Sequence, residues 1–151
     1  MVDVDEGEVE AGDYKVPFDI TDDGALRTPA GFGLGEVASG ARGAFLLAVG
    51  KSVKDWSALP ESTRERWMNA TEVLLETVRL TVEVAWSKLA KRMYFAHSEE
   101  DKWEDLPKAI QIAWEAAARQ AVNYMVAEDS SDVREVQEMD WRSWASRRLA
   151  E

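Results

Sequence analysis

The pattern of apolar and polar positions is irregular up to residue 35 and helical from residue 36 onward. Apolar residues spaced three and four positions apart predict a first helix over about residues 36–54. Between Pro60 and His97 the chain contains no further proline and no glycine, and a nearly continuous apolar stripe predicts helix throughout. This segment forms one long helix or two helices, and the β-branched run at Thr77–Thr81 is where a break is expected.

Two more helices are predicted toward the C-terminus. One begins at Pro107, because proline fits the first turn of a helix, and ends at the polar segment EDSSD. The other begins near Asp132, because Asp132 and Glu135 have the spacing of a capping box. Together with the preceding segments, these helices predict a mainly α fold.

Residues 1–35 show no helical periodicity and are predicted to form an irregular N-terminal arm. Two prolines and a glycine cluster exclude helix over residues 14–35. Asp23-Gly24 fits a tight turn, so extended pieces at 16–20 and 25–27 are compatible with a small β-hairpin. The start of the arm offers little to bury and carries charges that repel one another. Its acidic residues are Asp3, Asp5, Glu6, Glu8, Glu10 and Asp13.

One motif occurs twice, as DWSALPESTRERW and as KWEDLPKAIQIAW. The shared positions, each pair 47 residues apart, are Trp56/Trp103, Leu59/Leu106, Pro60/Pro107, Trp67/Trp114 and Ala70/Ala117. A single helix pair cannot bury its own apolar face, whereas two stacked pairs can. We therefore expect two tandem helix-pair modules over residues 36–128, divided at about 36–80 and 81–128. A C-terminal helix would follow within 129–151.

Composition excludes several classes of protein. An apolar fraction of 46% supports a packed core, and a net charge of −11 argues against direct binding to nucleic acid or to an anionic membrane. No apolar run reaches the ~20 residues that a transmembrane helix needs. The acidic N-terminus differs from a secretory signal, and the absence of cysteine fits a cytoplasmic location.

No arrangement of catalytic or metal-binding residues stands out. The chain has a single histidine, His97, and no cysteine, which excludes thiolate ligands and leaves no histidine pair for zinc. We interpret His97, which is followed by Ser98 and Glu99, as a surface residue at a helix end rather than a general base. We therefore expect a non-enzymatic protein without a cofactor or a metal.

The repeated motif, Trp-x2-Leu-Pro-x6-Trp-x2-Ala, resembles a helical module of small proteins encoded by actinobacterial bacteriophages. The resemblance covers about residues 41–125. It implies an accessory or host-directed phage protein, or less often a component of the phage particle. The segments WSALP and WEDLP are also weakly similar to ryanodine-receptor-type repeats, but the chain lacks the Gly-Trp and His-Pro elements of that family.

Two sets of residues are candidates for binding. Tryptophan and arginine, which dominate interaction hot spots, occur together in the C-terminal segment, with an amphipathic closing helix as the alternative interpretation. The residues of this first set are Trp141, Arg142, Trp144, Arg147 and Arg148. The second set combines the repeated tryptophans with arginines suited to an anionic group, with core packing as the alternative. Its residues are Trp56, Trp67, Trp103, Trp114, Arg64, Arg66 and Arg92.

These features favour an intracellular interaction protein, a phage-encoded accessory factor that binds or inhibits a host protein. The alternatives are sequestration of a small anionic ligand such as a nucleotide, a structural role in the phage particle, and acidic mimicry of nucleic acid. If residues 60–97 form one helix, its apolar sides need cover from a second copy of the chain. We then expect a homodimer or higher oligomer with an interface around Leu75–Trp86. A break would bury those sides within one chain.

Overall fold

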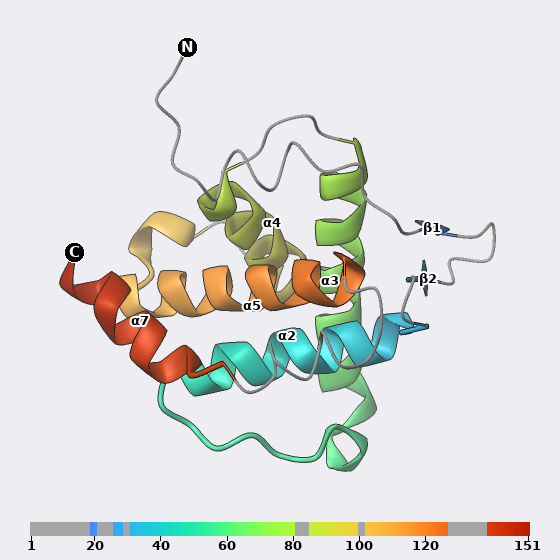
Figure 1. Ribbon diagram of the computed structural model, residues 1–151, viewed down its shortest axis with the longest axis horizontal. Coiled ribbons are helices and arrows are strands. Elements are labelled where there is room, and N and C mark those ends of the chain that lie inside the picture. The colour runs from blue at the N-terminus through green and yellow to red at the C-terminus, as the bar shows by residue number, and fades with distance from the viewer. Residues whose placement is uncertain (1–18, 21–25, 29–30, 81–84, 100–101, 127–138) are drawn as a thin grey trace.

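The computed structural model describes residues 19–20, 26–28, 31–80, 85–99, 102–126 and 139–151 (Figure 1). The described helices are α2 (Leu34–Ala48), α3 (Glu61–Leu80), α4 (Trp86–Ser98), α5 (Lys108–Val126) and α7 (Trp141–Ala150). The mainly α prediction is confirmed. Strands β1 (Asp19–Ile20) and β2 (Leu26–Arg27) pair antiparallel, within the two extended pieces predicted from the sequence. The acidic arm, the Asp23-Gly24 turn and the helix start near Asp132 lie outside the described residues.

The segment between Pro60 and His97 forms two helices. Helix α3 ends at Leu80, and α4 begins at Trp86 after Ala85, whose backbone is extended. Leu75 and Trp86 are buried within the single chain. The homodimer interface around Leu75–Trp86 was inferred from one continuous helix, and that premise is wrong. The oligomeric state itself stays a prediction.

Four helices share one core. In Figure 1, α2 and α5 lie side by side with opposite chain directions, and α3 crosses behind them. Helix α4 packs against both α3 and α5. The largest buried core side chains come from all four helices, and include Val37, Leu74, Leu89 and Met125. The helix pairs α2–α3 and α4–α5 therefore bury their apolar faces against each other.

The two copies of the motif have matching backbone contacts. A short 3-10 helix precedes the second helix in each copy, η1 (Trp56–Ala58) and η2 (Trp103–Asp105). In both, the backbone N–H of the leucine donates to the tryptophan carbonyl at 3.1 Å. Pro60 and Pro107 then stand directly before α3 and α5, and each proline carbonyl accepts the first helical hydrogen bonds. The recurring residues thus start two helices in the same way.

Helix α7 closes the structure by packing against α2 and α5 (Figure 1). Its first turn is capped by Asp140, whose carboxylate accepts a hydrogen bond from the backbone N–H of Ser143 at 3.0 Å. Trp141 is 2% exposed and contacts Ala44 and Ala116 in a second, smaller apolar cluster. Among the helices described, none is both long enough and apolar enough to span a membrane.

Candidate functional site

The repeated tryptophans at the second position of the motif meet in the core. Trp67 and Trp114 stack with their ring centroids 4.9 Å apart and an interplanar angle of 24°. Phe45 packs against both rings, at 5.6 Å and 4.8 Å. Trp67 and Trp114 are 5% and 3% exposed, so they fill the interior rather than surround a ligand. Stacking of equivalent residues joins the two helix pairs.

His97 lies against the same stack. Its ring centroid is 4.9 Å from that of Trp67 and 5.0 Å from that of Trp114. Burial, and then the positive charge of Arg66, lower the pKa of His97 to about 4. His97 stands in the last turn of α4, as expected, but it is half-buried against the aromatic core, so its interpretation as a surface residue is wrong in that respect. At neutral pH its imidazole is uncharged.

The second candidate set does not assemble into one pocket. Trp56 lines a shallow cavity of about 420 Å³ beside Phe32 and Tyr124. The other three tryptophans of the set line neither this cavity nor two smaller ones, of about 270 Å³ and 140 Å³. None of these three cavities is lined by Arg64, Arg66 or Arg92. The tryptophans and arginines of this set therefore share no common binding site among these cavities.

The first candidate set divides between the inner and outer faces of α7. Trp141 is buried, and Trp144 and Arg148 are half-buried against the body of the protein. Arg142 and Arg147 are exposed. The inner residues pack α7 against the rest of the protein. This agrees with the alternative interpretation of the set, an amphipathic closing helix. The outer arginines are the part of this set that a partner can reach.

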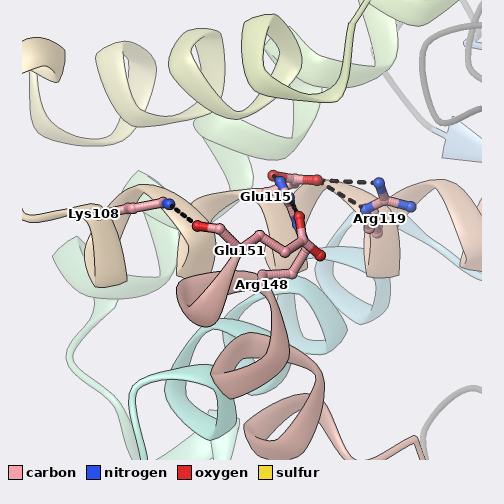
Figure 2. Close-up of polar contacts among 5 residues, drawn as sticks. All are labelled: Lys108, Glu115, Arg119, Arg148 and Glu151. Atoms are coloured by element: carbon pink, nitrogen blue, oxygen red, sulfur yellow. Dashed lines mark hydrogen bonds and ion pairs between the residues drawn. The ribbon is translucent and has the colours of Figure 1, made fainter. Parts of the chain in front are cut away.

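Glu115 on α5 holds α7 through an internal ion-pair network (Figure 2). Its side chain is 7% exposed, and one carboxylate oxygen accepts hydrogen bonds from Arg119 Nε at 3.2 Å and Arg119 Nη2 at 3.1 Å. The other oxygen accepts from Arg148 Nη2 at 2.6 Å. Although burial acts to lower the pKa of Arg148, its bonds to Glu115 and Glu151 raise that pKa overall. Lys108 donates to the Glu151 main-chain carbonyl at 3.4 Å and completes the network.

A groove of about 270 Å³ lies between α2, α5 and the beginning of α7. We call it the α2–α7 groove. Gly40, Gly43, Ala44 and Leu47 of α2 form one side of it. The other residues of the groove that bear on its chemistry are Val53, Gln120 and Trp141. Val53 is 48% exposed although it is apolar, so the edge of the groove offers contact area to a partner.

Two glycines on this side of α2 have different surroundings. A Cβ atom on Gly40 would lie 2.5 Å from Cε1 of Tyr124, so Gly40 is needed for the close approach of that ring. A Cβ atom on Gly43 would meet nothing nearer than Val53 Cγ1, at 3.9 Å. Neither glycine has a positive φ angle. Glycine inside a helix is less stable than alanine by about 1 kcal/mol, and nothing in the packing around Gly43 offsets this cost.

Two residues that line the groove each carry a buried polar atom without a partner among the described residues, and neither atom is exposed to solvent. Gln120 is 3% exposed, and its Oε1 has no hydrogen-bond donor in the described part of the chain. Trp141 Nε1 likewise has no acceptor there. Unpaired buried groups of this kind need an explanation, such as an absent ligand or water.

Four basic residues stand close in sequence to residues that line the groove, although none of them lines it. Lys51 and Lys54 are exposed on either side of Val53 in sequence, and Arg142 follows Trp141 and lies beside Gly50. Arg42 precedes Gly43, and burial lowers the pKa of its guanidinium below the usual range. Within the residues that the structure describes, none of these four side chains forms an ion pair or a hydrogen bond. The lining of the groove itself is uncharged, and these four cations are not neutralised by an ion pair among the described residues.

Sequence reasoning identified only part of this site. Trp141 and Arg142 were candidates, but Gly43, Gln120 and the lysines beside Val53 were not. The available signal was Gly43 itself, a glycine inside a helical stripe, which lowers helix stability without an evident reason. Among the described residues, no group of three or more histidine, aspartate or glutamate side chains is placed to hold a metal ion.

Comparison with known proteins adds no relative: no protein-family model matches the chain, and no curated protein or solved structure is significantly similar to it.

Proposed function

We propose that this chain is a non-enzymatic interaction protein that binds an acidic segment of a partner protein in the α2–α7 groove. One observation carries the proposal. Gly43 leaves the middle of the groove open at a cost to helix stability, and no close contact requires a glycine there. A residue that lowers helix stability and has no packing role is typical of a functional position.

Charge complementarity supports an acidic partner. The chain has 18 Lys and Arg against 29 Asp and Glu, so most cations could find a carboxylate. The four basic residues close in sequence to the groove residues form no ion pair among the described residues. Unneutralised cations near a groove would attract acidic segments over a distance and repel basic ones.

The biological setting follows from the sequence resemblance alone. A cytoplasmic accessory factor of a bacteriophage, binding or inhibiting a host protein, is consistent with partner binding through a groove. The nucleotide alternative is less well supported, because the arginines and tryptophans suggested for it do not line a common cavity. Mimicry of nucleic acid also has no support at this face, since none of the residues that line the groove is acidic.

A selection from a random-peptide display library tests the proposal even though the partner is unidentified. The wild-type protein is the bait, and Gly43→Leu is the bait for counter-selection. Leucine is a good helix former, its Cβ would meet no clash at this position, and Gly43 lines the groove, so the variant should fold and yet obstruct the groove. We expect enriched peptides that are acidic and carry at least one apolar residue.

Matched variants assign the binding to the groove. Arg142→Glu should abolish binding of a selected peptide, whereas Arg92→Glu, the same charge change on an exposed residue of α4, should leave it intact. Ser87→Leu on α4 controls for the addition of an exposed leucine. Enrichment of basic peptides, or of peptides that bind Gly43→Leu and the wild type equally, would refute the proposal.

A further inference from the structure

Aromatic residues make up half of the lining of the cavity of about 420 Å³, which we call the α2–η1 cavity. They are Phe32, which precedes α2, Trp56 of η1 and Tyr124 of α5. The volume lies within the range of small-molecule sites, about 300–1,000 Å³. The other described residues that line the cavity all belong to α2, and are Gly35, Glu36 and Ser39.

The aromatic side chains are held in position by the fold. The backbone N–H of Phe32 donates to Thr28 Oγ1 at 2.8 Å. The Phe32 ring packs against Tyr124 with centroids 5.1 Å apart and an interplanar angle of 66°, so two rings that line the cavity meet at a steep angle. Trp56 packs against the core and is partly exposed. Several rings around one space suit a cation, because the face of each ring carries the negative end of its quadrupole.

The sequence repeat supplies a comparison for Trp56. Its equivalent in the second copy, Trp103, packs on Tyr94 with ring centroids 5.9 Å apart. Trp56 makes no ring contact with another aromatic side chain in the described part of the chain, and it lines the cavity instead. Packing of one ring on another therefore accounts for the tryptophan of the second copy but not for that of the first.

Glu36 supplies a negative charge to the same cavity. Among the described residues that line it, Glu36 is the only charged one. Its Oε1 accepts a hydrogen bond from the Gly33 N–H at 3.3 Å, which holds the side chain at the beginning of α2. Its Oε2 has no partner in the part of the chain that the structure describes. A carboxylate at this place favours a cationic ligand and repels an anionic one.

Gly35 leaves part of the cavity unfilled. A Cβ atom at this position would have no heavy atom within 4 Å, and the φ angle of Gly35 is not positive. Neither close packing nor backbone conformation therefore requires glycine here, although glycine is a poor residue for a helix. Because Gly35 lines the cavity, a larger side chain at this position would reduce the space available to a ligand.

We propose that the α2–η1 cavity binds a small molecule with a trimethylammonium group. The methyl groups contact the aromatic rings, and the carboxylate of Glu36 pairs with the positive charge. An ammonium group without methyl groups is more strongly hydrated and binds more weakly, and an uncharged group of the same shape lacks the attraction. Ser39 and Tyr124 line both this cavity and the α2–α7 groove, but the site is separate from the proposed function, because its ligand is cationic and its test needs no acidic peptide.

The test is a titration of the ¹⁵N-labelled protein with choline, followed through the indole N–H resonance of Trp56, which is assigned by its disappearance in Trp56→Leu. We expect a saturable shift. Ethanolamine has the charge without the methyl groups, and the carbon analogue of choline, with a tert-butyl group in place of trimethylammonium, has the shape without the charge. Each should bind at least about tenfold more weakly, a difference of about 1.4 kcal/mol. Equal binding of either compound, or no saturable shift with choline, would overturn the proposal. Tighter binding of a trimethyllysine peptide than of choline would overturn the assignment to a small molecule.

Matched variants assign choline to this cavity. Glu36→Gln keeps an acceptor for the Gly33 N–H but removes the charge, and it should bind choline about fivefold more weakly. Glu61→Gln, the same change on an exposed residue in the first turn of α3, should leave the affinity unchanged. Gly35→Leu should fold and weaken choline binding, whereas Gly43→Leu, which obstructs the groove, should not weaken it. Failure of this proposal is thus distinct from failure of the proposed function. Equal choline affinity for the wild type, Glu36→Gln and Gly35→Leu would contradict the assignment.

Discussion

Gly40 and Gly43 allow the packing of α2 to be tested with the same substitution at two positions of one helix. Gly40→Ala places a methyl group 2.5 Å from Cε1, 2.7 Å from Cζ and 2.9 Å from Oη of Tyr124. The Tyr124 ring is buried and packs edge-on against Phe32 at 5.1 Å, so the ring must be displaced. Gly43→Ala places the same group in ordinary van der Waals contact with Val53 Cγ1, its nearest neighbour at 3.9 Å, without a clash.

The magnitude follows from two contributions. Both variants gain helix propensity of about 1 kcal/mol, because alanine has less backbone freedom to lose than glycine. Gly40→Ala also introduces a steric overlap in a packed region, which costs about 1–3 kcal/mol. The propensity gain cancels in the comparison. Gly43→Ala should therefore be the more stable of the two by about 1–3 kcal/mol, and it should also be more stable than the wild type.

Thermal unfolding and urea titration measure this difference directly. In a chain of this length each kcal/mol shifts Tm by about 2–4 °C. The two variants should keep equal urea m-values, because neither changes the surface exposed on unfolding. If Gly40→Ala and Gly43→Ala have the same free energy of unfolding, the close approach of Tyr124 is not required by the fold. If Gly43→Ala lowers the free energy of unfolding, a methyl group at this position does clash with its surroundings.

Three further predictions concern ionisable residues. The wild type should lose stability as the pH falls from about 6.5 to about 4, because in that range His97 takes up a proton in the unfolded chain but not in the folded one, where its pKa is lowered. His97→Phe should not show this loss. Equal pH profiles for the two proteins would refute this. Glu115→Gln should lower the free energy of unfolding by about 1–3 kcal/mol, whereas Glu104→Gln, which weakens an exposed pair with Lys91, should change little in the same urea titration. Asp140→Ala should lower Tm by removing the N-cap of α7, and the wild type should lose this contribution as acid protonates Asp140, whose pKa its bonds to Ser143 lower; an unchanged Tm would contradict the cap.

Local sequence signals predicted where the helices lie, although α2 ends at Ala48 and not near residue 54 as expected. The apolar spacing and the two Leu-Pro segments marked where α2, α3 and α5 lie, because proline and helical periodicity act within a few residues. The break between α3 and α4 was one of two alternatives. Its outcome depends on whether Leu75 and Trp86 can be buried by other helices of the same chain, which is a property of the assembled core rather than of the segment.

The binding residues were harder to predict because their roles depend on contacts across the fold. The sequence indicates an exposed cation at Arg148, in the last helical turn, but this arginine is committed to Glu115, which lies 33 positions earlier. Arg142, only six positions before Arg148, remains unpaired within the described residues. No sequence pattern distinguishes the two. The same holds for Gly40 and Gly43, whose difference is the position of one tyrosine ring.

The central claim is that the α2–α7 groove is kept open for an acidic partner, and one measurement tests it most directly. The affinity of a selected acidic peptide is determined for the wild type and for Gly43→Leu, on samples whose Tm values have been recorded. The account predicts at least about tenfold weaker binding to Gly43→Leu, about 1.4 kcal/mol, with a Tm no lower than that of the wild type. Equal affinity for the two proteins would contradict it.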